Sequence, residues 1–123
     1  MQKITLKDGT TLEAVAVLGG QRMLNNTNRD TLTFVFDDSH GLGELDALFT
    51  SGNCEVITLH GTDPTGQETE YLLEGFTLRA ELKLAPEAAD SGALVNRISI
   101  TQARLTAAEE QAIAYQILMG VRA

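Results

Sequence analysis

The densest group of side chains that could do chemistry is formed by Asp37, Asp38, His40 and Glu44. Carboxylate oxygens and an imidazole nitrogen could together bind a divalent cation if the chain folded back on itself here. Asp37, Asp38 and His40 are therefore metal-binding candidates, and a metal-dependent enzyme is one hypothesis. The simpler interpretation is that these acids precede a helix, because the helix dipole stabilises negative charge at its N-terminus. We favour this interpretation and expect neither a metal nor a cofactor.

A pair of glycines, Gly41 and Gly43, separates a predicted strand from a predicted helix, where a dinucleotide-binding motif would lie. The third glycine of that motif is replaced by Asp46. The acids just before the helix would also repel a pyrophosphate group. We therefore do not expect nucleotide binding.

The single cysteine, Cys54, lies in an apolar run, which indicates a buried thiol and not a nucleophile. A catalytic pair with either histidine, His40 or His60, has no sequence motif to support it. We expect no catalytic residue, and the sequence predicts a protein that is not an enzyme.

The length and charge of the chain limit its function further. Its 123 residues suit a single domain covering residues 1–123. Seventeen acidic residues against nine basic ones give a net charge of −8, which disfavours direct contact with nucleic acid or an anionic membrane. One cysteine fits a reducing compartment, and the start of the chain does not resemble a signal peptide. We expect a protein that is cytoplasmic at synthesis.

The alternation of apolar and polar residues predicts an α+β domain, with a mainly antiparallel sheet of about six strands, a short middle helix and a C-terminal helix. The longest alternation, over residues 67–84, predicts a central strand with a bulge at Gly75, where the pattern shifts by one residue. Near the start, the pattern predicts a hairpin in which Ile4 faces Leu12 and Gly9 closes a three-residue turn.

The remaining segments give further local expectations. Residues 63–66 fit a type I turn. Residues 19–30 are expected to form the end of a strand and a long polar loop, and residues 85–92 a flexible connection. The middle helix is expected over residues 42–49, with Asp38 or Ser39 as its N-terminal cap and Gly52 as its stop.

The last helix carries the main functional expectation. Thr106 and Glu109 form a capping box at its start, and the helical pattern continues to about Met119. Its apolar surface is wider than packing on one sheet requires. We therefore predict that this helix contacts a protein partner, either a second copy or another protein, through Ile113, Tyr115, Ile117, Leu118 and Met119.

The order of these features resembles small tail-associated proteins of phages and prophages of Gram-positive bacteria. The resemblance covers most of the chain and rests on residues 3–10, 31–34, 42–49, 56–59 and 71–76. It implies a tail or baseplate component without catalysis, whose partners are other virion proteins and whose final location is the virion. The alternative is a small acidic phage-encoded inhibitor of a host defence protein or nuclease, which would mimic nucleic-acid charge with acids on one surface.

Overall fold

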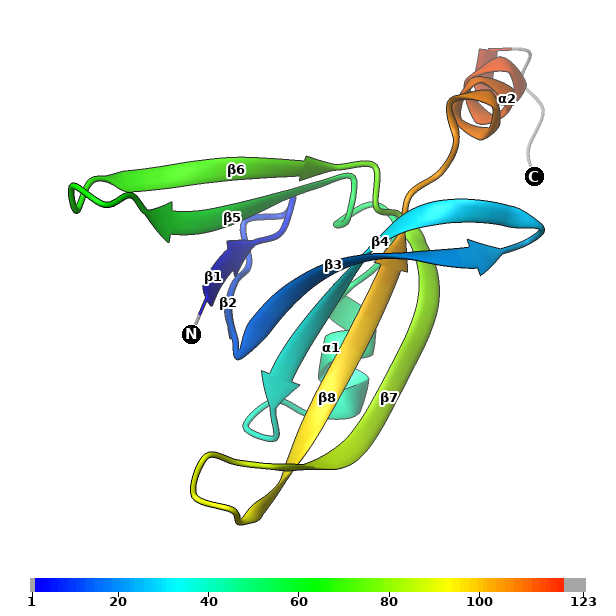
Figure 1. The fold of residues 1–123 in the computed structure, drawn as a ribbon. Helices are drawn as coiled ribbons and strands as arrows, with labels where there is room; N and C mark the ends of the chain where they lie inside the picture. The colour runs from blue at the N-terminus through cyan, green and yellow to red at the C-terminus, as the bar shows by residue number, and fades with distance from the viewer. Residues whose placement is uncertain (1, 119–123) are drawn as a thin grey trace.

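The computed structural model describes residues 2–118, which form two four-stranded antiparallel sheets and two helices (Figure 1). The first sheet has the order β2 (Thr11–Ala14), β1 (Gln2–Thr5), β5 (Val56–Thr62) and β6 (Glu68–Glu74). The second has the order β3 (Ala16–Leu24), β4 (Thr27–Asp37), β8 (Leu94–Ala103) and β7 (Leu78–Ala88). The helices are α1 (Leu42–Leu48) and α2 (Ala107–Leu118). The α+β class is confirmed, but the prediction of one sheet of about six strands is wrong.

The first hairpin has the predicted register. Ile4 lies opposite Leu12 in the β1–β2 pair, and both side chains are buried. Gly9 adopts φ +94°, and its N–H donates to the carbonyl of Leu6, which closes the turn. The hydrophobic register therefore selects the three-residue turn, as the sequence indicated.

The predicted central strand over residues 67–84 is wrong, because the chain changes sheets in its middle. β6 ends the first sheet at one edge, β7 ends the second sheet at another, and Gly75 connects them with φ +84°. A left-handed residue turns the chain sharply here, which glycine permits without strain. The phase shift in the apolar pattern therefore marked a crossing between sheets. The actual register shift in β7 lies between Arg79 and Glu81.

The predicted polar loop over residues 19–30 is also wrong, because β3 and β4 continue through it as a long hairpin. The turn consists of Asn25 and Asn26, with φ values of 53° and 60°. Two central residues with positive φ are typical of a type I′ turn, whose twist matches that of paired strands, and asparagine tolerates this conformation well. The predicted connection over residues 85–92 is likewise mostly strand, since β7 extends to Ala88.

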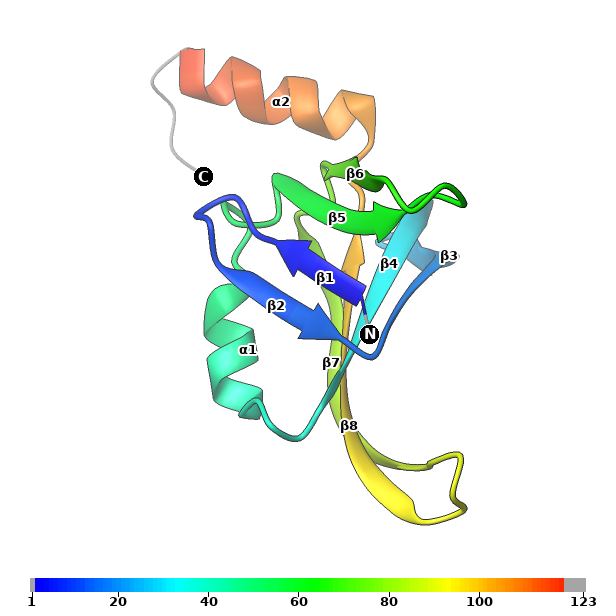
Figure 2. The same ribbon diagram turned by 90° about the vertical axis from the view of Figure 1, so that its left-hand side faces the viewer.

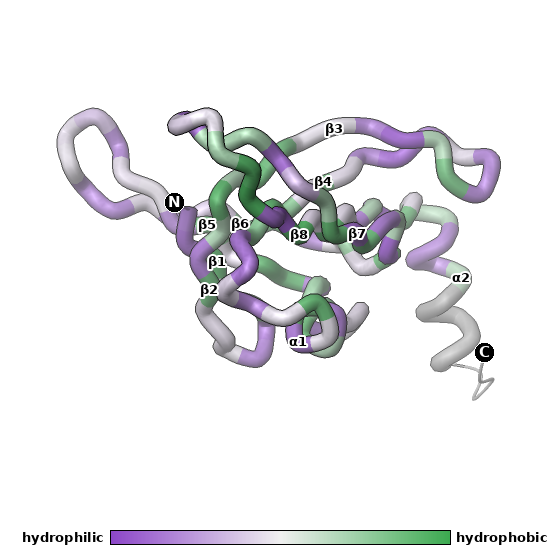
Figure 3. The backbone as a smooth tube through the Cα atoms, turned by 90° about the horizontal axis from the view of Figure 1, so that it is seen from below, coloured by the Kyte–Doolittle hydropathy of each residue, from purple (hydrophilic) through white to green (hydrophobic). Residues whose placement is uncertain are grey.

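The core is built by both sheets together with α1. Phe34 and Phe36 project from β4 and are fully buried, and Phe49 at the end of α1 packs against both rings. Ile4 of β1 and Ile100 of β8 complete the same cluster from the two sheets. Figure 3 shows the apolar segments of the strands running through the middle of the molecule, with hydrophilic hairpin ends outside.

The ends of α1 differ from the prediction. Gly41 is the N-terminal cap and makes no side-chain cap bond, and Phe49, not Gly52, is the C-terminal cap. Arg79 holds the carboxyl end of the helix to the second sheet, because its guanidinium donates to the carbonyl of Phe49 (2.7 Å) and to Asp46 (2.8 Å). Its Nε donates to the amide oxygen of Gln102, which is completely buried. α1 is therefore fixed by a partly buried polar network as well as by its apolar face.

Candidate functional site

The structure does not bring the three metal candidates together. Asp37 accepts hydrogen bonds from the backbone N–H and the hydroxyl of Ser39, and these bonds lower the pKa of its carboxyl group. His40 pairs instead with Glu44, with 3.0 Å between Nδ1 and Oε1, and its ring contacts Phe36. Within residues 2–118, no group of three or more His, Cys, Asp or Glu side chains could hold a metal ion. Asp37 therefore stabilises the turn before α1 through its bonds to Ser39, and Glu44 pairs with His40 from within α1.

The cysteine is buried in this fold. Cys54 has no exposed surface, and burial raises the pKa of its thiol to about 11, so the thiolate required of a nucleophile is scarce near neutral pH. His60 is engaged elsewhere, because its Nε2 lies 2.9 Å from the hydroxyl of Thr5 and its Nδ1 lies 3.8 Å from Glu70. These contacts give no support to a catalytic pair of Cys54 and His60.

The first turn of α2 is fixed by the predicted capping box, which is confirmed. The backbone N–H of Thr106 donates to the carboxylate of Glu109 (2.9 Å), and the N–H of Glu109 donates to the hydroxyl of Thr106 (3.2 Å). Two backbone groups that would otherwise lack partners at the helix start are satisfied in this way.

A buried arginine then ties this turn to the second sheet. Arg29 of β4 has an exposed fraction of only 3%, and its guanidinium forms a two-pronged ion pair with Glu109. The same side chain donates to the carbonyls of Leu24 (3.1 Å) and Arg104 (3.2 Å). Arg29 therefore joins the β3–β4 turn, the end of β8 and the start of α2 in one contact. We call Arg29, Thr106 and Glu109 the helix anchor.

Beyond the anchor, α2 stands away from both sheets, as the two perpendicular views show (Figures 1 and 2). Ala107, Ala108, Gln111 and Ala112 are all exposed. The backbone of four predicted contact residues, Ile113, Tyr115, Ile117 and Leu118, continues this helix, but their side chains lie outside the described part of the structure, as does the whole of Met119.

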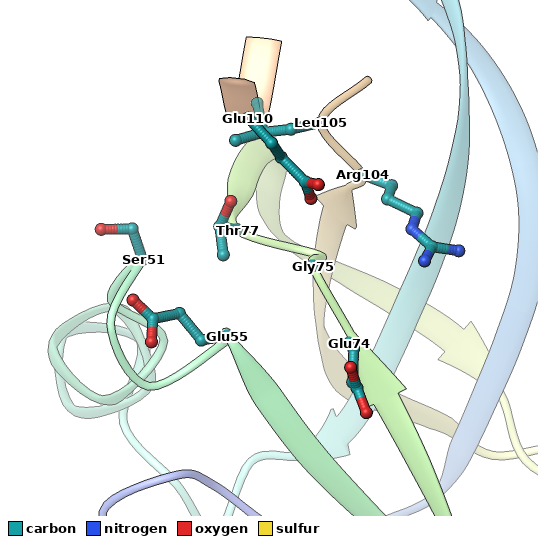
Figure 4. A pocket seen from close by; sticks show the side chains of 8 residues that line it. All are labelled: Ser51, Glu55, Glu74, Gly75, Thr77, Arg104, Leu105 and Glu110. Atoms are coloured by element: carbon teal, nitrogen blue, oxygen red, sulfur yellow. The ribbon is translucent and has the colours of Figure 1, made fainter. Parts of the chain in front are cut away.

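A hollow of about 500 Å³ lies beside the first turn of α2. Its wall contains three glutamates, Glu55, Glu74 and Glu110, and one arginine, Arg104, whose guanidinium lies 5.7 Å from the centre of the Phe76 ring. Figure 4 shows that the three carboxylates point in different directions and do not converge on one point. The hollow therefore has an acidic character but lacks the arrangement that acid–base catalysis or metal binding needs.

Sequence reasoning found the capping box but missed Arg29 and the hollow. Arg29 shares one face of β4 with Thr31 and Thr33, so extending the predicted strand back through residues 27–30 would have placed Arg29 on the sheet. The hollow has no local signal, because it is assembled from the ends of four separate segments.

The helix anchor predicts a specific pH dependence of stability. The hydrogen bonds from Arg29 are the main cause that lowers the pKa of Glu109 from 4.5 to about 2. Since the pKa is lower in the folded chain, this contact contributes fully above pH 4.5 and is lost as the pH falls from 4.5 to about 2. We expect the melting temperature of the wild type to fall in this window more steeply than that of Glu109→Gln. Equal slopes in calorimetry would contradict the contribution of the anchor.

No protein-family model matches the chain, and no curated protein or solved structure matches it either. Among residues 2–118, neither helix has the length and apolar character needed to cross a lipid bilayer.

Proposed function

We propose that the chain is a non-enzymatic structural or assembly protein of a phage or prophage, associated with the tail or baseplate, which works through protein contacts made by α2. The observation that supports this proposal is the position of α2, which is anchored at its first turn and projects from the sheets (Figure 2). The assignment to a phage rests on the resemblance of the sequence pattern.

The composition of α2 supports a docking role. Eight of its twelve residues are apolar by sequence, and isolated helices shorter than about 12 to 15 residues are only marginally stable in water. A helix that is largely apolar gains stability by covering that surface. We infer that a protein partner covers α2 in the functional assembly.

The hollow beside α2 adds a charge preference to the same surface. Glu55, Glu74 and Glu110 share the wall of the hollow with Arg104, so the balance of charge among its lining residues is negative. A partner lying along α2 would place its own side chains over this hollow, where lysine or arginine would be favoured over acidic residues.

The acidic-inhibitor alternative finds less support in the placement of charge. Glu13 lies on β2, Asp37 ends β4 and is followed by Asp38, and Asp90 lies in the turn between β7 and β8. Nucleic-acid mimicry needs carboxylates gathered on one face. Glu68, Glu70 and Glu74 gather along β6, but the other acids are spread over both sheets, so we propose only the structural function.

Substitution within α2 tests the proposal. Ile117→Glu places a charge among the predicted contact residues, and we expect it to abolish the α2-dependent part of self-association or partner binding in light scattering. Gln111→Glu adds the same charge at an exposed position of the same helix and is expected to have no effect. Unchanged association by Ile117→Glu, with circular dichroism showing a folded chain, would contradict the role of α2.

A further inference from the structure

The two sheets leave four strand edges, and most of these are protected against pairing with another chain. An edge strand presents unpaired backbone N–H and C=O groups, which proteins usually block by shortness, proline, bulges or charge. β2 has only four residues. β7 contains Pro86, opposite Asn96, and the register shift near Arg79. These two edges are therefore poor templates for strand addition.

The edge of β6 is protected by charge. The N–H of Gly75 donates to the carbonyl of Glu55, so backbone bonds to β5 alternate back along the strand through Leu73, Tyr71 and Thr69. The residues between them, Glu68, Glu70, Leu72 and Glu74, direct their backbone groups to the free edge. Three of these four residues are glutamates. Any two-fold antiparallel pairing that overlaps most of β6 would set glutamate opposite glutamate, which is destabilising.

Among residues 2–118, none of these protections is found at the edge of β3. It is nine residues long, contains no proline, shows an uninterrupted register with β4, and carries only one charged residue, Arg22. Figure 3 shows β3 along the outer margin of the molecule. Two of its large apolar side chains, Leu18 and Met23, are 56% and 66% exposed. An edge strand of this length and character is a template for another strand.

The turn geometry fixes which residues of β3 face outward. In a two-residue hairpin the flanking pair, here Leu24 and Thr27, is hydrogen-bonded, and bonded pairs then alternate along the strands. The residues of β3 whose backbone groups point away from β4 are therefore Val17, Gly19, Gln21 and Met23.

We propose that the free edge of β3 pairs with β3 of a second copy, antiparallel and related by a two-fold axis at Gly20. In this register Val17 lies opposite Met23 and Gly19 opposite Gln21, so all four outward residues form backbone bonds. Leu18 lies opposite the aliphatic stem of Arg22. No like charges meet, Gly20 places no side chain at the axis, and each exposed Met23 gains an apolar neighbour. The contact joins the β3–β4–β8–β7 sheets of the two copies into one continuous sheet.

Disulfide trapping tests this register directly. Gly20 would face Gly20 in a pair without backbone hydrogen bonds, where the Cα atoms lie about 4.5 Å apart, within the range that a disulfide spans. A Cβ added at Gly20 meets only the Thr31 hydroxyl oxygen at 3.4 Å, which is an ordinary contact. The native Cys54 is buried and does not compete. We therefore expect Gly20→Cys, treated with diamide, to give a disulfide-linked dimer as the main species on a non-reducing gel.

Two matched variants control for random collision. In the proposed dimer of Leu18→Cys, the two introduced cysteines would lie about 14 Å apart along the strands, too far for a disulfide. In Leu72→Cys the thiol lies on β6, whose edge is protected by glutamates. Both positions are exposed, as Gly20 is, so their thiols are equally free to collide. We expect only traces of dimer from either variant. A dimer from Gly20→Cys that survives in combination with Ile117→Glu shows that the β3 contact is separate from the α2 contact.

Several results would overturn the proposal. Failure of Gly20→Cys to cross-link while its circular dichroism matches the wild type would exclude a two-fold contact at Gly20. Equal cross-linking of Leu18→Cys or Leu72→Cys would mean that collision, not a defined register, joins the chains. Protection of β3 amides only when a different protein is added would assign the edge to that protein.

Discussion

Phe34→Ala is expected to lower the free energy of unfolding by about 3 to 5 kcal/mol, as large-to-small substitutions of buried aromatic residues do. Phe34 is completely buried on β4, the second strand of its sheet. Its ring centre lies 5.3 Å from that of Phe49, which itself contacts Phe36. Removing this ring leaves a cavity where the second sheet meets the end of α1. Urea unfolding followed by circular dichroism measures the loss.

The matched control is Leu18→Ala on the neighbouring strand. Leu18 is 56% exposed, so this change should alter stability by less than about 0.5 kcal/mol. Unfolding should be measured at a low protein concentration, where association through β3 does not contribute to the free energy of unfolding. A loss of less than about 1 kcal/mol for Phe34→Ala would mean that the ring does not hold the layers together.

Arg29→Met is expected to release α2 while leaving the sheets folded. Methionine keeps much of the volume of the side chain but provides no hydrogen bonds, so Glu109 and the carbonyls of Leu24 and Arg104 lose the donors that Arg29 supplies. Hydrogen exchange is the appropriate measurement, because it reports each amide separately. We expect the amides of residues 109–112 to exchange as fast as unprotected ones, while those of β4 and β8 keep their protection.

Arg22→Met provides the control for Arg29→Met. Arg22 lies directly opposite Arg29 in the β3–β4 register, but its side chain is 42% exposed and forms a long ion pair with Glu81, at 3.6 Å. We expect this variant to exchange like the wild type. If α2 keeps its protection in Arg29→Met, the capping box alone holds the helix, and Arg29 is not part of the anchor.

Sequence reasoning worked where the determining residues lie close together. The first hairpin followed from the spacing of Ile4, Leu12 and Gly9, and the capping box from Thr106 and Glu109, which bond across a single helical turn. The strand carrying Phe34 was likewise evident from a local alternation of apolar residues.

The errors arose where distant parts of the chain decide the structure. The shift at Gly75 is compatible with both a bulge and a change of sheet, and only pairing with β5 and β8 distinguishes the two. Asn25 and Asn26 have a polar composition typical of loops, although their positive φ values make a tight turn. The helix anchor also required tertiary information, because Arg29 and Glu109 are 80 residues apart.

The most direct measurement of the docking role is hydrogen exchange of α2 across a series of protein concentrations, in the wild type and in Ile117→Glu. If α2 docks on another copy, its amides beyond residue 112 become more protected as the wild-type concentration rises and stay unprotected in Ile117→Glu. If docking instead needs another virion protein, the same protection appears when that protein is added. Exchange of these amides that stays the same at every concentration and with every candidate partner would contradict a docking role for α2.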